Sequence, residues 1–314
     1  MKTDRVEQQL EHLRALRTLS PADAAVAELR KALRDRVNVI VAKAAGMAGD
    51  LRLQALVPYL LEAFARLFDK PRDTDPQCWG KNAIAKALKD LGHAESVTFL
   101  RGFRHIQMEP VWGGEEDMAA VLRGTCALAL VQCTDITRAE TMLHLIDALA
   151  EGDPGVRRDA TMAVEQMAGH EAVWLLRLKA RLGDKPEVTG QVFESLLRLE
   201  GKSSVSFIST FLDAIDEQVA EEAALALGSS RLPGALEALK LAWKKSKNRA
   251  LSPILLRAIS ASRLDDAFEF LLAIVREGRQ SDSQDALRAL EIHSDSDDIR
   301  RRTEEALARM SRKS

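Results

Sequence analysis

The sequence predicts an all-α protein, a right-handed superhelical solenoid of about eight to nine helical pairs. Ala, Leu, Arg and Glu, which are strong helix formers, dominate the composition. Aromatic residues make up only 4% of the 314 residues, and the 17 glycines and 9 prolines are fewer than the turns of a large β-sandwich or barrel require. Paired apolar segments also recur every 31–33 residues between residues 120 and 290. These observations favour helical repeats and disfavour an all-β fold.

Two consecutive segments illustrate the repeat unit. One runs from Val156 as VRRDATMAVEQMAGHEAVWLLRLKARL, and the next runs from Val188 as VTGQVFESLLRLEGKSSVSFISTFLDAI. Each contains an apolar helix, a turn with a glycine (Gly169 or Gly201) and a second apolar helix. The same pattern fits nine starts: Val6, Val37, Trp79, Arg123, Val156, Val188, Val219, Leu251 and Ser283.

Two positions of the repeat mark the predicted core. With each start counted as position 0, position 4 is apolar in all nine units and position 20 in eight, including Leu143 and Leu176. Position 4 lies on one face of the first helix and position 20 on one face of the second. A pair of short helices cannot bury both faces alone, so neighbouring pairs are expected to stack. The sequence therefore predicts one continuous domain over residues 1–314.

Polar residues and prolines indicate where several first helices begin. Asp153, Asp216 and Asn248 stand where a side chain can accept the free N–H groups of a first turn. Pro154 and Pro186 fit the first helical position. Residues 291–314 are predicted to form a C-terminal cap, because a terminal unit needs a polar outer face.

A family resemblance is visible around residue 153. The segment DPGVRRDATMAV, with Asp153, Pro154, Val156 and Arg157, and the turn AGHEAVWLL resemble a HEAT-type repeat. Within that family the chain is most similar to the short bacterial HEAT-like repeats related to phycobilisome-lyase proteins. The resemblance covers residues 120–290 closely and residues 1–119 loosely. It implies an α-α superhelix and, as a weaker alternative for function, a lyase or chaperone-like partner of a chromophore protein.

Two insertions interrupt the period in the divergent N-terminal part. They fall at residues 68–77 and 105–117 and are expected to be loops, which are either tolerated decoration or part of a binding surface. The second contains Trp112 beside Gly113 and Gly114 and three acidic residues. We expect an exposed aromatic side chain on a mobile acidic loop.

Charge and cysteine content restrict the compartment and the partners. The 45 basic and 47 acidic residues give a net charge of −2, so the chain as a whole has no general attraction for nucleic acid. The N-terminus is too charged for a signal peptide, and no apolar run is long enough for a membrane span. Three cysteines cannot form a disulfide framework. A cytoplasmic location is expected.

The sequence predicts no catalytic residues, no metal site and no cofactor. A HEAT-repeat di-iron hydroxylase of the deoxyhypusine hydroxylase type would need several His-Glu pairs, and only His170 is followed by Glu. Nucleophile elbows, phosphate-binding glycine loops and zinc-protease motifs are absent from the sequence. Cys126 and Cys133 are seven residues apart, which predicts core residues on one helix face.

A discontinuous basic strip is predicted on the second helices. Positions 18, 21 and 25 face away from the predicted core and supply Trp174, Arg177, Arg181, Lys240 and Lys244. These side chains form a solvated face, a protein- or peptide-binding groove, or a nucleic-acid groove like that of helical-repeat DNA glycosylases. Acidic residues interrupt the strip, which disfavours a phosphate-tracking surface.

The leading prediction is a non-enzymatic scaffold or adaptor that binds a protein or peptide on its concave face, because a helical superhelix offers a long rigid groove. The first alternative is a nucleic-acid-binding protein that uses the basic strip. The candidate binding residues are Trp112, Trp174, Arg177, Arg181, Lys240 and Lys244.

Overall fold

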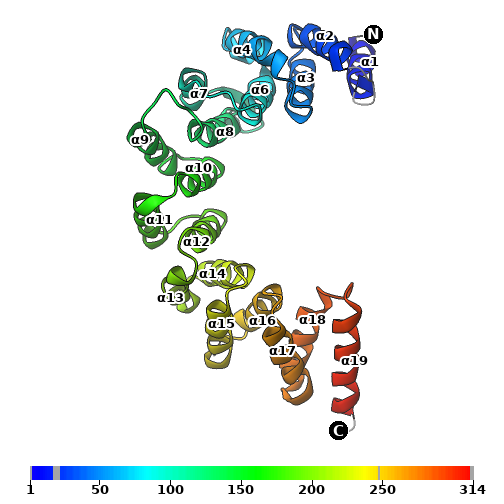
Figure 1. Ribbon diagram of the computed structural model, residues 1–314, viewed down its shortest axis with the longest axis vertical. Helices are drawn as coiled ribbons and strands as arrows, with labels where there is room; N and C mark the ends of the chain where they lie inside the picture. The colour runs from blue at the N-terminus through cyan, green and yellow to red at the C-terminus, as the bar shows by residue number, and fades with distance from the viewer. Residues whose placement is uncertain (1, 17–21, 247, 312–314) are drawn as a thin grey trace. The chain divides into compact units, whose positions relative to one another are not determined.

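The computed structural model describes residues 2–16, 22–246 and 248–311, and in these ranges most of the chain is helical (Figure 1). Across the described residues there are nineteen α-helices, short 3-10 turns and one two-stranded hairpin. Apart from the four-residue α5, the helices form nine successive pairs in chain order. The prediction of an all-α fold of helical pairs is confirmed.

The packing divides the chain into two compact units, Met1–Met167 (unit 1) and Ala168–Ser314 (unit 2). The expectation of one continuous domain stays a prediction. Unit 1 contains α1 (Lys2–Ala15), α2 (Ala22–Leu33), α3 (Asn38–Asp50), α4 (Val57–Arg66), α5 (Pro71–Thr74), α6 (Trp79–Asp90), α7 (Ser96–Phe103), β1 (Met108–Val111), β2 (Gly114–Asp117), α8 (Ala120–Leu130), α9 (Arg138–Leu149) and α10 (Pro154–Met167). Unit 2 contains α11 (Gly169–Leu182), α12 (Pro186–Glu200), α13 (Lys202–Ser209), α14 (Glu217–Ser229), α15 (Pro233–Lys245), α16 (Leu251–Ala261), α17 (Asp265–Glu277), α18 (Gln280–Glu291) and α19 (Asp297–Ser311).

In each unit the first helices of successive pairs pack against one another. In unit 1 they are α3, α6, α8 and α10, and in unit 2 they are α12, α14, α16 and α18. Small residues permit this close approach: a Cβ added at Gly228 in α14 would overlap the backbone of Ala258 in α16. Most position-4 residues are buried, including Val41, Ala160 and Leu255. The stacked core expected from the repeat is therefore present within each unit.

The predicted polar residues at the helix starts accept hydrogen bonds from the backbone. The carboxylate of Asp216 accepts the N–H of Gln218 at 2.9 Å, and that of Asp153 accepts the N–H of Val156 at 3.0 Å. The side chain of Asn248 accepts the N–H of Ala250 at 2.9 Å.

The predicted register is wrong in the second helix of the pair formed by α8 and α9. Leu143, placed in the core by its repeat position, is 62% exposed, whereas Thr141 and Leu145 are buried. The cause is a longer connection: residues 131–137 separate α8 from α9, while only Gly201 separates α12 from α13. The extra residues shift the buried face of α9 by two positions.

The second insertion is a β-hairpin, not the loop that was expected. Strands β1 and β2 pair antiparallel, with Met108 opposite Asp117 and Val111 opposite Gly114. The first insertion contains α5 and a 3-10 turn. Cys133 lies beyond the end of α8, so the prediction that it shares a helix face with Cys126 is also wrong. Within the described ranges, none of the helices combines the length and apolar character needed to cross a bilayer.

Candidate functional site

The hairpin in unit 1 holds the most exposed aromatic side chain that the structure describes. Trp112 occupies the loop between β1 and β2, and its exposed fraction is 104%. Gly113, the other loop residue, has a φ of 98°, a conformation that favours glycine. Val111 beside it and the carboxylates of Glu115 and Glu116 are also exposed. The hairpin therefore presents an indole ring to solvent within an acidic surrounding.

The foot of the hairpin is hydrogen-bonded to the first insertion. The buried side chain of Gln107 donates to the carbonyl of Asp75 at 2.8 Å and to the carboxylate of Glu109 at 2.6 Å. The same Glu109 carboxylate accepts the backbone N–H of Gln77 at 2.8 Å. The two insertions, which are separate in the sequence, are therefore joined in the structure.

A buried ion pair lies beneath this junction. Lys81 and Asp75 are both 0% exposed, and Lys81 Nζ is 3.1 Å from Asp75 Oδ2. The Asp75 carboxylate also accepts the side-chain amide of Asn38 at 3.0 Å and the backbone N–H of Gly80 at 2.7 Å. Lys81 Nζ donates in addition to the carbonyl of Leu67 at 3.2 Å. These bonds satisfy the buried charges, whose removal from water is otherwise costly.

Strained backbone leads into α6. Lys70, Gln77 and Cys78 have φ values of 47°, 60° and 57°, a region that non-glycine residues rarely adopt. Such conformations persist only where surrounding contacts impose them. Here the Glu109 carboxylate at the hairpin foot accepts the backbone N–H of Gln77, and the carbonyl of Asp75 accepts that of Cys78.

An arginine secures the other end of the hairpin. Arg123 in α8 is 2.5 Å from Asp117 and 3.1 Å from Glu151, and it donates to the carbonyl of His105 at 3.0 Å. Burial acts to raise the pKa of Asp117, but hydrogen bonds from the Gln107 backbone, a second backbone N–H and Arg123 lower the pKa overall. The carboxylate therefore stays ionised and paired.

The cysteines show no sign of nucleophilic chemistry. Burial raises the pKa of Cys78 to about 12 and that of Cys133 to about 11, and it raises the pKa of Cys126 further. Reactive thiols require a lowered pKa. Within the described residues, no three His, Cys, Asp or Glu side chains gather in an arrangement that could hold a metal ion.

The strip on the second helices consists of exposed aromatic and paired basic side chains. Trp174 in α11 is 66% exposed and stacks with His170, with ring centroids 6.1 Å apart. Arg177 forms an ion pair with Glu200 at 2.7 Å and lies 4.7 Å above the ring of Phe207. Burial acts to raise the pKa of Glu200, but the hydrogen bonds from a serine and from Arg177 lower it overall.

The other basic residues of the strip also cover aromatic rings. Arg181 lies 4.8 Å from the Phe207 centroid, so two arginines of α11 share one ring of α13. Lys240 and Lys244 of α15 lie 5.7 Å and 5.6 Å from the centroid of Phe270 in α17. We call this arrangement, two cations four residues apart over a ring of the next second helix, a cation–aromatic bridge.

Unit 1 contains the same bridge. Arg30 of α2 and Arg34, the residue after the end of α2, each lie 5.5 Å from the ring centroid of Tyr59 in α4. The cation–aromatic bridge therefore recurs in a part of the chain where no ligand groove was predicted. This recurrence indicates a structural role, in which the bridge links neighbouring second helices. Arg177, Arg181 and their lysine counterparts therefore contribute to packing between repeats.

The strip does not line the concave face that was expected. In unit 2 the first helices α12, α14, α16 and α18 lie on the inner side of the curved row, and α11, α13, α15 and α17 lie on the outer side (Figure 1). The first helices also contact one another more extensively than the second helices do. The physical reason is that smaller residues on the first helices face the neighbouring helical pair. Successive first helices therefore lie closer together than successive second helices do.

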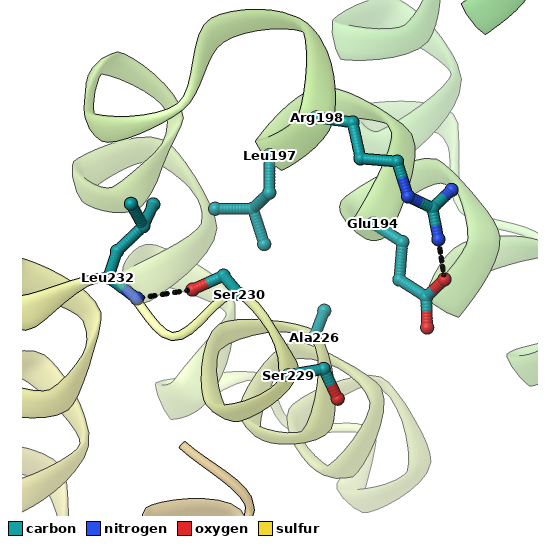
Figure 2. Close-up of a pocket in the computed structure, with 7 residues that line it drawn as sticks. All are labelled: Glu194, Leu197, Arg198, Ala226, Ser229, Ser230 and Leu232. Carbon is teal, nitrogen blue, oxygen red and sulfur yellow. Dashed lines mark hydrogen bonds and ion pairs between the residues drawn. The ribbon is translucent and has the colours of Figure 1, made fainter. Parts of the chain in front are cut away.

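A pocket of about 330 Å³ lies between α12 and α14 in unit 2 (Figure 2). Its charged groups already have partners inside the protein. Arg198 is 2.7 Å from Glu194, and the hydroxyl of Ser230 accepts the N–H of Leu232 at 3.3 Å. The pocket therefore offers no unpaired charge to a ligand.

Comparisons with known proteins do not assign the chain to a family. No protein-family model and no curated protein matches it. A solved structure titled human deoxyhypusine hydroxylase in complex with glycerol is 19% identical, with 81% of this chain and 88% of that chain covered and a TM-score of 0.31. At so low a TM-score the likeness carries no argument about fold or function. The expected relation to chromophore-protein lyases stays a prediction.

Proposed function

We propose that this protein is a scaffold or adaptor that binds a protein partner by inserting Trp112 into an apolar pocket of that partner. The observation that carries the proposal is the full exposure of Trp112 at the end of a hairpin whose foot is anchored by buried polar contacts. Tryptophan side chains that enter a partner's pocket are frequent centres of binding energy. A preformed hairpin loses little conformational freedom on binding, which favours affinity.

Charge indicates the chemistry of the partner. Glu115 and Glu116 flank the tip and are exposed, and Glu115 is only loosely paired with Arg72 at 3.6 Å. A pocket with basic side chains at its rim would complement these carboxylates and increase the association rate. The partner surface we propose is therefore an apolar pocket bordered by lysine or arginine.

A photo-crosslinking phenylalanine analogue at position 112 tests this proposal in cells. The same analogue at position 174 is the matched control, because Trp174 is also exposed but lies on the strip. We expect a crosslinked protein from position 112 and none from position 174. The crosslinked peptide, identified by mass spectrometry, should contain apolar residues next to Lys or Arg.

The affinity of the purified partner then measures the contribution of the indole ring. Trp112→Ala should weaken binding at least about thirtyfold, since truncation of a central tryptophan costs about 2 kcal/mol or more. Trp174→Ala should leave the affinity unchanged. Equal affinity of the Trp112 variant and the unchanged protein would refute the proposal, and a loss confined to the Trp174 variant would favour binding along the strip. Salt-sensitive binding of DNA that requires Arg177 would favour the nucleic-acid alternative.

A further inference from the structure

A cavity in unit 2 is lined by cations from three separate segments of the chain. It has a volume of about 550 Å³ and lies at the C-terminal end of α15 and the N-terminal ends of α16 and α18. Lys244 comes from α15, Arg249 from the connection to α16, and Arg279 from the residue before α18. The sequence predicts Lys244 on the strip, whereas only the fold brings Arg279 to the same cavity.

Three cations and two carboxylates line the cavity, so the formal charge of its lining is +1. Among the described residues, no carboxylate forms an ion pair with Lys244, Arg249 or Arg279, although Lys244 also covers the ring of Phe270. Two carboxylates line the cavity. Asp285 is paired with Arg288 at 3.4 Å, and Asp282 accepts the hydroxyl of Ser281 at 3.3 Å. Positive charge therefore exceeds negative charge at this cavity.

Trp243 forms a fixed part of the wall. Its indole N–H donates to the hydroxyl of Ser252 at 2.9 Å, and its ring packs edge-on against Phe270 with centroids 5.5 Å apart. These contacts hold the indole in one orientation beside Lys244. The residue is therefore a natural reporter of any ligand that enters the cavity.

We infer that this cavity binds a phosphate-bearing small ligand. Guanidinium groups recognise phosphoryl oxygens through paired hydrogen bonds, and an ammonium group adds a mobile point charge. Two arginines and a lysine that converge from three segments match an oxyanion better than a neutral or cationic ligand. The site lies in the other unit from the hairpin, so it does not depend on the proposed function.

The binding of inorganic pyrophosphate to protein labelled with 5-fluorotryptophan tests the inference. The four tryptophans give four fluorine resonances, and Trp243→Phe assigns the one at the cavity. We expect pyrophosphate to shift the Trp243 resonance in a saturable manner and to leave the Trp112 resonance unchanged. Added salt should weaken the binding, since the attraction is electrostatic.

Charge removal at exposed positions provides the control. The double substitution Arg249→Gln and Arg279→Gln should weaken pyrophosphate binding at least about tenfold, because two charge-assisted contacts are lost. Arg257→Gln removes an exposed arginine of α16 that does not line the cavity and should have no effect. No saturable shift at millimolar pyrophosphate, or equal binding by the double variant, would overturn the inference.

Two further titrations distinguish the source of the phosphate. Adenosine triphosphate and O-phosphoserine carry the same oxyanion chemistry on different bodies. Tighter binding of adenosine triphosphate than of pyrophosphate would assign a nucleotide, and tighter binding of O-phosphoserine would assign a phosphorylated side chain. Equal binding of all three would assign recognition of the phosphoryl group alone.

Discussion

The hairpin of unit 1 and the strip of unit 2 both expose a tryptophan, but their polar side chains are used differently. At the hairpin, the charges of Asp75, Lys81 and Arg123 are buried at its base, and the tryptophan at the tip is fully exposed. On the strip, Arg177 and Arg181 cover an aromatic ring of the next helix. An exposed tryptophan is therefore better evidence of binding at the hairpin, where buried polar side chains hold its base, than on the strip, where the neighbouring arginines pack between repeats.

The largest effect is expected from breaking the buried ion pair. Lys81→Met leaves the Asp75 carboxylate buried without its cation, which costs about 3–5 kcal/mol. Amide hydrogen exchange should accelerate in α6 and the hairpin but not in α12. The double variant Asp75→Asn with Lys81→Met should recover part of the loss, because no uncompensated charge remains. Unchanged exchange in the single variant would show that the ion pair does not support the hairpin.

A smaller effect is expected from removing a cation–aromatic bridge. Phe207→Leu removes the ring beneath Arg177 and Arg181 and should destabilise unit 2 by about 1–2 kcal/mol. Faster hydrogen exchange in α11 and α13 measures this loss. Phe207→Tyr retains the ring and is the control. A Leu variant as stable as the Tyr variant would contradict the structural role of the bridge.

Acidification should weaken unit 1 through His105. Burial is the main cause that lowers the pKa of His105 below its ordinary value of 6.5, and the charge of Lys81 acts in the same direction. The unfolded chain therefore binds the proton more readily, so the contribution of His105 to stability is full above pH 6.5 and declines as the pH falls through that value. The drop in stability between pH 7.5 and pH 5.5, measured by urea unfolding, should be smaller in His105→Gln. An equal drop in both proteins would exclude His105 as its source.

The smallest effect is expected at the hairpin tip. Trp112 has no packing to lose, so Trp112→Ala should change the free energy of unfolding by less than about 0.5 kcal/mol. Thermal unfolding of this variant beside the unchanged protein measures the difference. A loss above about 1 kcal/mol would mean that the indole ring supports the fold, and the proposed docking role would lose its basis.

Much of the fold could be predicted because it depends on local pattern. The spacing of apolar residues predicted the helical pairs, and Asp153, Asp216 and Asn248 predicted helix starts that the structure confirms. The predicted register was wrong at Leu143, because the connection before α9 is longer than in the other pairs. A longer connection shifts the buried face of the helix but leaves its apolar spacing unchanged, so the local pattern does not reveal the shift. For the candidate site, the residues of the strip could be predicted from the sequence, but the aromatic rings and carboxylates that they contact could not.

What the sequence by itself determined is therefore the helical composition, the period of the repeat and the places where many helices begin, because each of these depends on residues within a few turns. Only the tertiary structure decided the hairpin, its link to the first insertion and the burial of Asp75 with Lys81. It also decided which cations cover aromatic rings and which converge on the cavity beside Trp243. These features join side chains up to about 37 residues apart, such as Asn38 and Asp75, and no local pattern encodes such a meeting.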